Sequence, residues 1–274
     1  MITASIVTYK TKEDELRRVL NCSLEADLDC VYVVDNSPTD SLRSIVSQFK
    51  SDKLLYIYGQ GNIGFGSGNN IAMRKALESG SLYHIILNPD IIFDRNAIHG
   101  LITYMQNHKE VGVVVPKLTY PDGRFQAAAM LLPSPFVIFA RRLMPQSVVR
   151  LINGRYELLD CDLSVPREVP NVCGCFILIK SDTLDKAGLF DERFFMYFED
   201  FDLVRRIHQH AKVVYYPKVS IVHAHAAEHR RNKALLKASI KSAIKYFNKW
   251  GWFWDIDRIK RNKYSLSNNS ILVD

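Results

Sequence analysis

The chain has 274 residues, of which 47% are hydrophobic and 24% are charged, and its formal net charge is +7 at pH 7. This composition is typical of one large or two small globular domains, and the chain contains no internal repeat or low-complexity region that would suggest a scaffold protein. We find neither a signal-peptide pattern nor a transmembrane run, so we expect a cytoplasmic protein with its five cysteines reduced.

The first half of the chain alternates strand and helix patterns. Apolar runs predict strands at 5–9, 30–35, 54–58, 83–88 and 111–116, and amphipathic segments predict helices at 12–26, 37–49, 67–79 and 96–108. Continuous apolar strands separated by helices indicate a mostly parallel central sheet covered on both faces, which is a doubly wound α/β fold.

Polar residues follow several of these strands, at the edge where such sheets bind ligands. The polar positions include Thr8, Tyr9, Asp35, Asn36, Ser37, Asn88 and Asp90. Pro89 removes a backbone donor and bends the chain between Asn88 and Asp90. A plain turn uses the same residue types, but the convergence on one edge favours a metal or phosphate ligand.

A glycine-rich segment, GQGNIGFGSGNN, covers residues 59–70. Its glycines allow backbone amides to approach an anion at the start of a helix. It is not a dinucleotide fingerprint, because Asn69 stands where a third glycine belongs and the segment follows the third strand. A flexible loop is the alternative, but the segment's place beside Asp35 and Asp90 favours a nucleotide diphosphate.

The second half begins irregularly, and residues 120–167 predict loops, a hairpin and short helices. A strand pattern returns at NVCGCFILIK, where the spacing of Cys173 and Cys175 is too tight for a usual zinc site, so we interpret them as small buried thiols.

An acidic cluster follows the apolar residues FFMYF and opens a predicted helix at Glu199. Acidic residues in a first helical turn, with Asp202 paired to Arg206, would have a purely structural role. Apolar surroundings instead raise a carboxylate pKa toward use as a general base.

Six segments occur in the order SIVTYK, VVDNSPTDS, NIGFGSGNN, LNPD, CGCFILI and FFMYFEDFDLVRR. Over roughly residues 3–225 the chain resembles the family 2 glycosyltransferases with the GT-A fold, especially the bacterial rhamnosyltransferase-like branch. The resemblance implies an inverting, metal-dependent enzyme that moves L-rhamnose from dTDP-L-rhamnose onto a hydroxyl of a growing polysaccharide or lipid-linked glycan. A UDP- or GDP-linked donor, a nucleotidyltransferase and a non-catalytic nucleotide-sugar-binding relative are the alternatives.

The resemblance also implies roles for individual residues. The donor nucleotide sugar is expected to contact Thr8, Tyr9, Asp35, Asn62, Gly64, Asn70 and Asn88. Asn88-Pro89-Asp90 stands in place of the family's Asp-x-Asp motif, which implies Asp90 as the main ligand of Mg²⁺ or Mn²⁺.

The remaining implied roles concern the second half of the chain. His223 matches a frequent metal-binding histidine, with His225 as the competing candidate. Asp200, beside Glu199, is implied as the catalytic base, and Gly174 is implied on the acceptor side.

We divide the chain into a glycosyltransferase domain at 1–228, with a nucleotide-binding half (1–116) and an acceptor half (117–228), and a basic, aromatic helical extension at 229–274. The extension predicts either a helix packed on the domain, a homodimer contact, or an anionic membrane surface at 235–263 that would make the protein peripheral. No motif suggests nucleic-acid binding. On the membrane interpretation, the protein should sediment with anionic vesicles at low salt, and deleting the residues after Gly251 should weaken this binding while sparing catalysis on a soluble acceptor.

Overall fold

The computed structural model describes residues 1–224 and 233–267. The strands are β1 (Ile2–Thr8), β2 (Cys30–Asp35), β3 (Leu54–Tyr58), β4 (Tyr83–Leu87), β5 (Ile91–Ile92), β6 (Val111–Thr119), β7 (Phe125–Gln126), β8 (Ala129–Met130), β9 (Arg167–Glu168), β10 (Asn171–Val172), β11 (Phe176–Lys180) and β12 (Lys212–His223). The helices are α1 (Glu13–Glu25), α2 (Arg43–Gln48), α3 (Phe65–Glu78), α4 (Ala97–Asn107), α5 (Pro135–Leu143), α6 (Gln146–Tyr156), α7 (Ser181–Ala187), α8 (Glu199–Ile207), α9 (Lys233–Trp250) and α10 (Ile256–Leu266).

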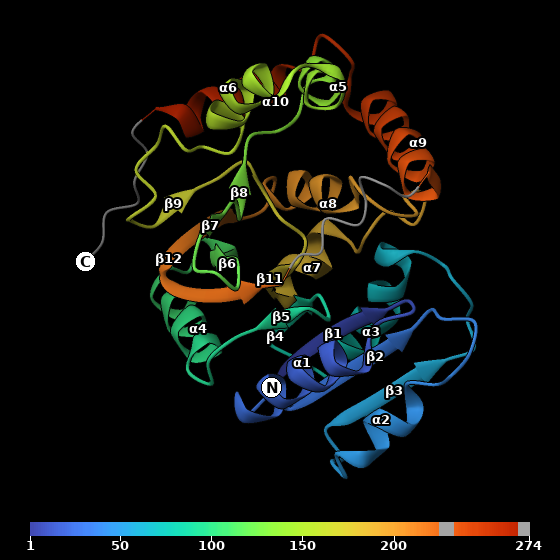
Figure 1. Cartoon of the computed structure of the whole chain (residues 1–274). Coiled ribbons are helices and arrows are strands. Elements are labelled where there is room, and N and C mark those ends of the chain that lie inside the picture. The colour runs from blue at the N-terminus through green and yellow to red at the C-terminus, as the bar shows by residue number, and fades with distance from the viewer. Residues whose placement is uncertain (225–232, 268–274) are drawn as a thin grey trace.

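The central sheet has the order β3-β2-β1-β4-β11-β6-β12-β5 (Figure 1). The strands β1 to β4 are parallel, as the alternation of strands and helices predicts. β11 then enters antiparallel between β4 and β6, whereas β12 is parallel to β6. The α/β prediction is confirmed, with a mixed rather than parallel sheet in the second half.

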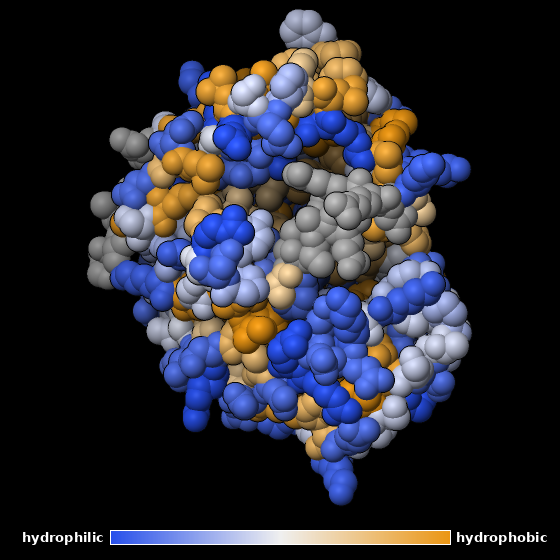
Figure 2. Space-filling model, in the orientation of Figure 1, coloured by the Kyte–Doolittle hydropathy of each residue, from blue (hydrophilic) through white to orange (hydrophobic). Residues whose placement is uncertain are grey.

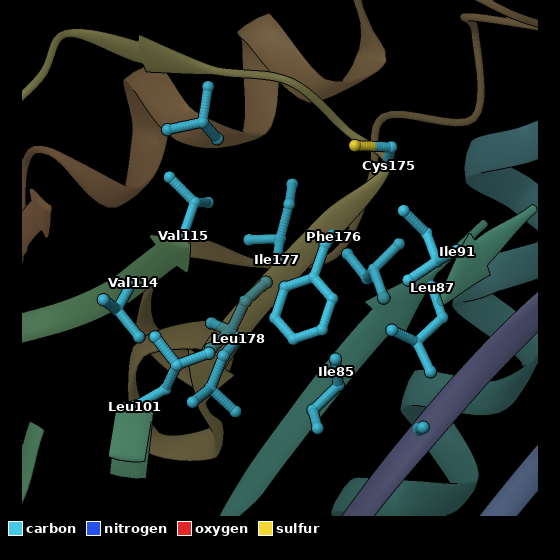
Figure 3. Close-up of a cluster of buried hydrophobic side chains, with 14 of the residues drawn as sticks. Ile85, Leu87, Ile91, Leu101, Val114, Val115, Cys175, Phe176, Ile177 and Leu178 are labelled. Atoms are coloured by element: carbon cyan, nitrogen blue, oxygen red, sulfur yellow. The ribbon is translucent and has the colours of Figure 1, made fainter. Parts of the chain in front are cut away.

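The main core lies around β11, whose apolar run is buried on both faces. Figure 3 shows Phe176, Ile177 and Leu178 among side chains of β4 and β6. On β1, alternation directs Ile6 into this core and Val7 into a second, smaller core with α3. Helices therefore cover both faces of the sheet, and its strand ends stay available.

The second predicted helix, at 37–49, begins later than expected, at Arg43. The Ser37 amide donates to the Asp35 carboxylate, and the Ser37 hydroxyl accepts from the Lys10 amide. These contacts hold the chain after β2 in a loop at the strand ends, so the helix starts six residues further on.

The C-terminal extension is not a separate unit. Arg205 of α8 is fully buried and forms two hydrogen bonds, of 2.7 and 2.8 Å, with the Asp255 carboxylate. Asn262 of α10 is paired with the backbone of Leu132 in both directions. Figure 1 shows α5, α6, α9 and α10 together at one end of the molecule, opposite β3 and α2.

This packing corrects the expectation that the residues after Gly251 can be removed without loss, because their deletion would leave the Arg205 charge buried without Asp255. In the part of the chain that the structure describes, no helix combines the length and apolar character needed to cross a membrane.

Candidate active site

A cavity of about 550 Å³ opens at the strand ends. It is bordered by the ends of β1 and β4, the start of α3 and residues 195–197. Six residues predicted to contact a donor or a metal lie in its lining: Thr8, Tyr9, Asn62, Gly64, Asn88 and Asp90. The lining also includes Lys10, Lys12 and Asn36, which bring amide and ammonium groups suited to phosphate and sugar oxygens.

Asp35 lies beneath this cavity rather than in its wall. Its fully buried carboxylate accepts hydrogen bonds from the Thr8 hydroxyl (3.0 Å), the Ser37 amide (2.9 Å) and the Tyr56 hydroxyl (2.6 Å). In this arrangement Asp35 fixes the ends of β1, β2 and β3 relative to one another.

The structure corrects the expectation for Asn70. Its side-chain amide donates to the Phe190 carbonyl and accepts from the Phe190 amide, each at 2.9 Å. Asn70 is buried and does not line the cavity. It joins α3 to the segment before the acidic cluster, so we assign it a structural role.

Asn88-Pro89-Asp90 forms a turn between β4 and β5 and also faces the cavity. The Ile91 amide donates to the Asn88 carbonyl at 3.4 Å, and the Asn88 amide donates to the Cys175 carbonyl at 2.8 Å. The turn and the ligand interpretations of this motif are therefore compatible, because the turn is what presents the Asp90 side chain.

Asp90 meets His223 at the end of β12, where its Oδ1 lies 3.3 Å from the imidazole Nε2. Burial disfavours the charged imidazole, but the hydrogen bond and negative charge of Asp90 outweigh burial and raise the pKa of His223. Behind the ring, Gln126 lies 3.0 Å from Nδ1. His225, the other candidate, falls outside the described residues.

This pair fits a divalent cation that also binds phosphate and water. Mg²⁺ or Mn²⁺ needs only one or two protein ligands under those conditions, and the described residues contain no larger cluster of His, Cys, Asp and Glu suited to a metal. Gln126 adds to the fit, because its buried Oε1 has no partner among the described residues. Rotating the Gln126 amide would let its Oε1 accept a hydrogen bond from the His223 Nδ1–H. The lone pair of His223 would then be on its Nε2, the atom that could bind a metal.

Glu199 and Asp200 open α8 after a strained turn. Tyr197 and Phe198 both have φ of 68°, a left-handed backbone conformation that residues other than glycine rarely adopt. Phe198 is held there by Tyr246 and Phe247 of α9, with ring centroids 5.3 and 6.2 Å away. The C-terminal extension thus supports the turn that positions the two carboxylates.

The two carboxylates have unusual protonation properties. Burial raises the pKa of Asp200 to about 7, against the opposing effect of hydrogen bonds from the Phe201 and Gly174 amides. Burial and the charge of Asp200 raise the pKa of Glu199 well above its usual range. Asp202 has a structural role instead: it forms an ion pair with Arg206 at 2.9 Å, as expected from their spacing of four residues on a helix.

Gly174 lies against Asp200, and a Cβ added to it would come within 3.1 Å of Asp200 Oδ2. The adjacent Cys173 lies within electrostatic reach of both sites. Its negative charge raises the pKa of Asp200, while His223 lowers the pKa of the Cys173 thiol and Asp90 raises it. The 173–175 segment therefore lies between the Asn88-Pro89-Asp90 turn, whose Asn88 amide donates to the Cys175 carbonyl, and Asp200, which lies against Gly174.

This geometry agrees with a sequence comparison in which residues 3–188 match the glycosyl transferase family 2. The chain belongs to that family.

Two curated relatives of this family 2 chain carry transferase names. The low-salt glycan biosynthesis hexosyltransferase Agl10 of Haloferax volcanii is 26% identical over 202 residues, which are 73% of this chain and 59% of the relative. The N-acetylglucosaminyl-diphospho-decaprenol L-rhamnosyltransferase of Mycobacterium tuberculosis is 26% identical over 242 residues, or 83% of this chain and 77% of the relative.

The fold is shared with solved structures. The crystal structure of GalNAc-T7 with UDP, GalNAc and Mn²⁺ superposes with a TM-score of 0.64 at 14% identity, over 98% of this chain and 55% of the other. The family 2 chain thus has the predicted GT-A fold, and it spans less than two thirds of GalNAc-T7 and of Agl10.

Sequence reasoning placed Asn36 among the polar residues at the strand ends but gave it no role, and it assigned no site role to Gln126 or Cys173. Gln126 and Cys173 reach the site only through the pairing of β7 with β6 and the insertion of β11, and nothing local in the sequence indicates these contacts.

Proposed function

We propose that this chain is an inverting, metal-dependent glycosyltransferase that uses a nucleotide-sugar donor. The observation that carries the proposal is that residues 174–175 contact both the turn that presents Asp90 to the cavity, where Asp90 pairs with His223, and the buried Asp200, whose pKa is raised to about 7. Family membership supports the same reaction class.

The chain's residues divide the work as follows. The cavity receives the donor, with Thr8 and Tyr9 on its nucleotide side and Asn62, Gly64 and Asn88 near the diphosphate and sugar. Asp90 and His223 would hold Mg²⁺ or Mn²⁺, which would neutralise charge on the departing diphosphate. Asp200 takes the proton of an acceptor hydroxyl. The acceptor oxygen attacks the anomeric carbon of the donor sugar on the side opposite the departing diphosphate.

Glu199 has a supporting role in this scheme. Burial and the charge of Asp200 raise the pKa of Glu199 well above its usual range, which favours its neutral form beside the base. Gly174 leaves room for the Asp200 carboxylate and the acceptor.

The donor and the acceptor are proposed from the relatives. An L-rhamnosyltransferase among them suggests dTDP-L-rhamnose as donor and a growing bacterial cell-surface polysaccharide or lipid-linked glycan as acceptor. We propose that the protein works in the cytoplasm, at the inner face of the membrane.

Nucleotide binding and transfer test the proposal separately. We expect dTDP with Mn²⁺ to raise the melting temperature more than UDP or GDP does, and excess chelator to remove the effect. Asp90→Ala should abolish this metal-dependent shift and lower transfer from dTDP-L-rhamnose at least ~100-fold. Asp162→Ala, at an exposed carboxylate, is the control and should change neither. Full transfer in chelator, or in Asp90→Ala, would disprove the assignment.

A further inference from the structure

An apolar groove of about 730 Å³ runs between α5 and α9, far from β3 and α2. Its walls are the apolar faces of both helices, completed by Trp252 and Phe253 from the segment that follows α9. Arg142 is the one charged side chain among its described lining residues. Helix packing normally closes such a space with side chains, whereas this one is open to solvent.

The rim of the groove is both aromatic and basic. Trp254 is 92% exposed and Phe253 is 74% exposed. α9 carries five lysines, and α5 and α6 carry two arginines each, while these three helices contain no Asp or Glu. Lys249 and Arg141 pair with acidic residues outside these helices, and Lys245 bonds the Arg193 carbonyl, so the remaining cations supply the charge of this surface. Figure 2 shows hydrophobic and hydrophilic residues side by side over this end of the molecule.

The groove adjoins the donor cavity. Leu235 lines the cavity and its neighbour Leu236 lines the groove, so the first turn of α9 separates the two. A surface that binds along the groove would therefore lie next to the donor cavity.

We propose that α5, α9 and residues 251–254 dock the protein on an anionic lipid bilayer, with acyl chains entering the α5–α9 groove. The cations of these helices that have no acidic partner within the helices complement anionic headgroups, and the exposed aromatic rings suit the depth of the interface. The bilayer thus contacts α5 as well as the tail at 235–263, and docking does not depend on sugar transfer.

Tryptophan fluorescence reports on this surface directly, because the chain's three tryptophans are Trp250, Trp252 and Trp254. The probe is a vesicle of equal parts phosphatidylcholine and phosphatidylglycerol with brominated acyl chains. We expect at least half of the emission to be quenched at low salt, and little quenching with pure phosphatidylcholine.

A pair of variants separates insertion from nonspecific adsorption. Ile240→Asp in the groove, where the native side chain is 48% exposed, should weaken vesicle binding and quenching at least ~10-fold. Leu82→Asp makes the same kind of change at a residue that is 64% exposed near the N-terminal strands, and it should change neither. Both variants should keep the dTDP-dependent melting shift, so failure of docking is distinguishable from failure of the proposed function.

Two results would overturn the proposal. Sedimentation with vesicles without quenching by the brominated chains would mean adsorption by charge alone. Concentration-dependent self-association without lipid, abolished by Ile240→Asp, would mean that the groove binds a second copy of this chain.

Discussion

Asp200 is a carboxylate in surroundings that disfavour its charge, and this controls when it can act as a base. Because its pKa is about 7, roughly half of the molecules hold it protonated at neutral pH. We expect kcat to rise about tenfold per pH unit below pH 7 and to level off above it. Asp200→Asn should lower kcat at least ~100-fold with donor binding nearly unchanged, whereas the same loss from Glu199→Gln alone would identify Glu199 as the base.

The same residue should cost stability at high pH. An unfolded aspartate has a pKa of about 3.9. The folded state therefore keeps a proton that the unfolded chain has lost, and the resulting stabilisation is complete below about pH 4 and is lost as the pH rises through about 7. At pH 8 we expect Asp200→Asn to be more stable than the wild type by about 1–3 kcal/mol in urea unfolding. Equal stability of the two proteins at pH 8 would show that the carboxylate is well solvated.

Gly174 offers a test of how closely the base is positioned. A methyl group there would lie 3.1 Å from Asp200 Oδ2 and would push the carboxylate away from the acceptor. We expect Gly174→Ala to lower kcat by about 10- to 100-fold, with an unchanged dTDP melting shift. Gly154→Ala on α6, where the nearest atom is 3.8 Å from the added carbon, should leave kcat unaltered.

At the scale of elements, the start of α3 shows how tightly the loop before it is fitted. Gly64 has φ of +92°, and a Cβ there would meet the Phe195 carbonyl oxygen at 2.2 Å. Gly64→Ala should therefore destabilise the protein by about 3 kcal/mol or more, measured by urea unfolding. Gly61→Ala, with φ of +68° and open space around it, carries the conformational cost alone and should lose only about 1 kcal/mol.

A second prediction concerns the clamp between α8 and α10, by which we mean the buried ion pair of Arg205 with Asp255. Asp255 accepts from Arg205 and also from the Arg258 amide at the start of α10. Asp255→Asn removes one charge of a buried pair and should cost about 3 kcal/mol of unfolding free energy. Asp257→Asn alters the more exposed partner of Arg205 and should cost under about 1 kcal/mol. Equal costs would mean that burial does not decide the strength of the clamp.

The sequence predicts elements well where the information is local. Alternating apolar runs indicate the strands β1 to β4 and the helices between them, and parallel strands bring Thr8, Asn88 and Asp90 to one edge without further information. It predicts less well where a distant segment completes a contact. The position of Asn70 near the start of a helix suggests that it contacts the donor. Its side-chain amide instead forms hydrogen bonds with the backbone of Phe190, 120 residues away.

At the scale of the whole molecule, the two predicted halves and the C-terminal extension are joined by strand pairing and packing. β11 comes from the expected acceptor half, but it pairs with β4 of the expected nucleotide-binding half. It also pairs with β6, which crosses the expected boundary at residue 116. The C-terminal extension packs on the turn before Asp200. We expect one cooperative unfolding transition for the full chain, with donor-site and tryptophan signals changing together.

The late insertion of β11 also has a consequence for biosynthesis. As the chain leaves the ribosome, β4 is complete while the strand that will cover its open edge has not yet been translated. An unpaired strand edge readily joins the edges of neighbouring chains. Nascent molecules are therefore most vulnerable to aggregation between the emergence of β4 and that of β11, so slower synthesis at low temperature, or a chaperone that shields this edge, should raise the yield of soluble protein.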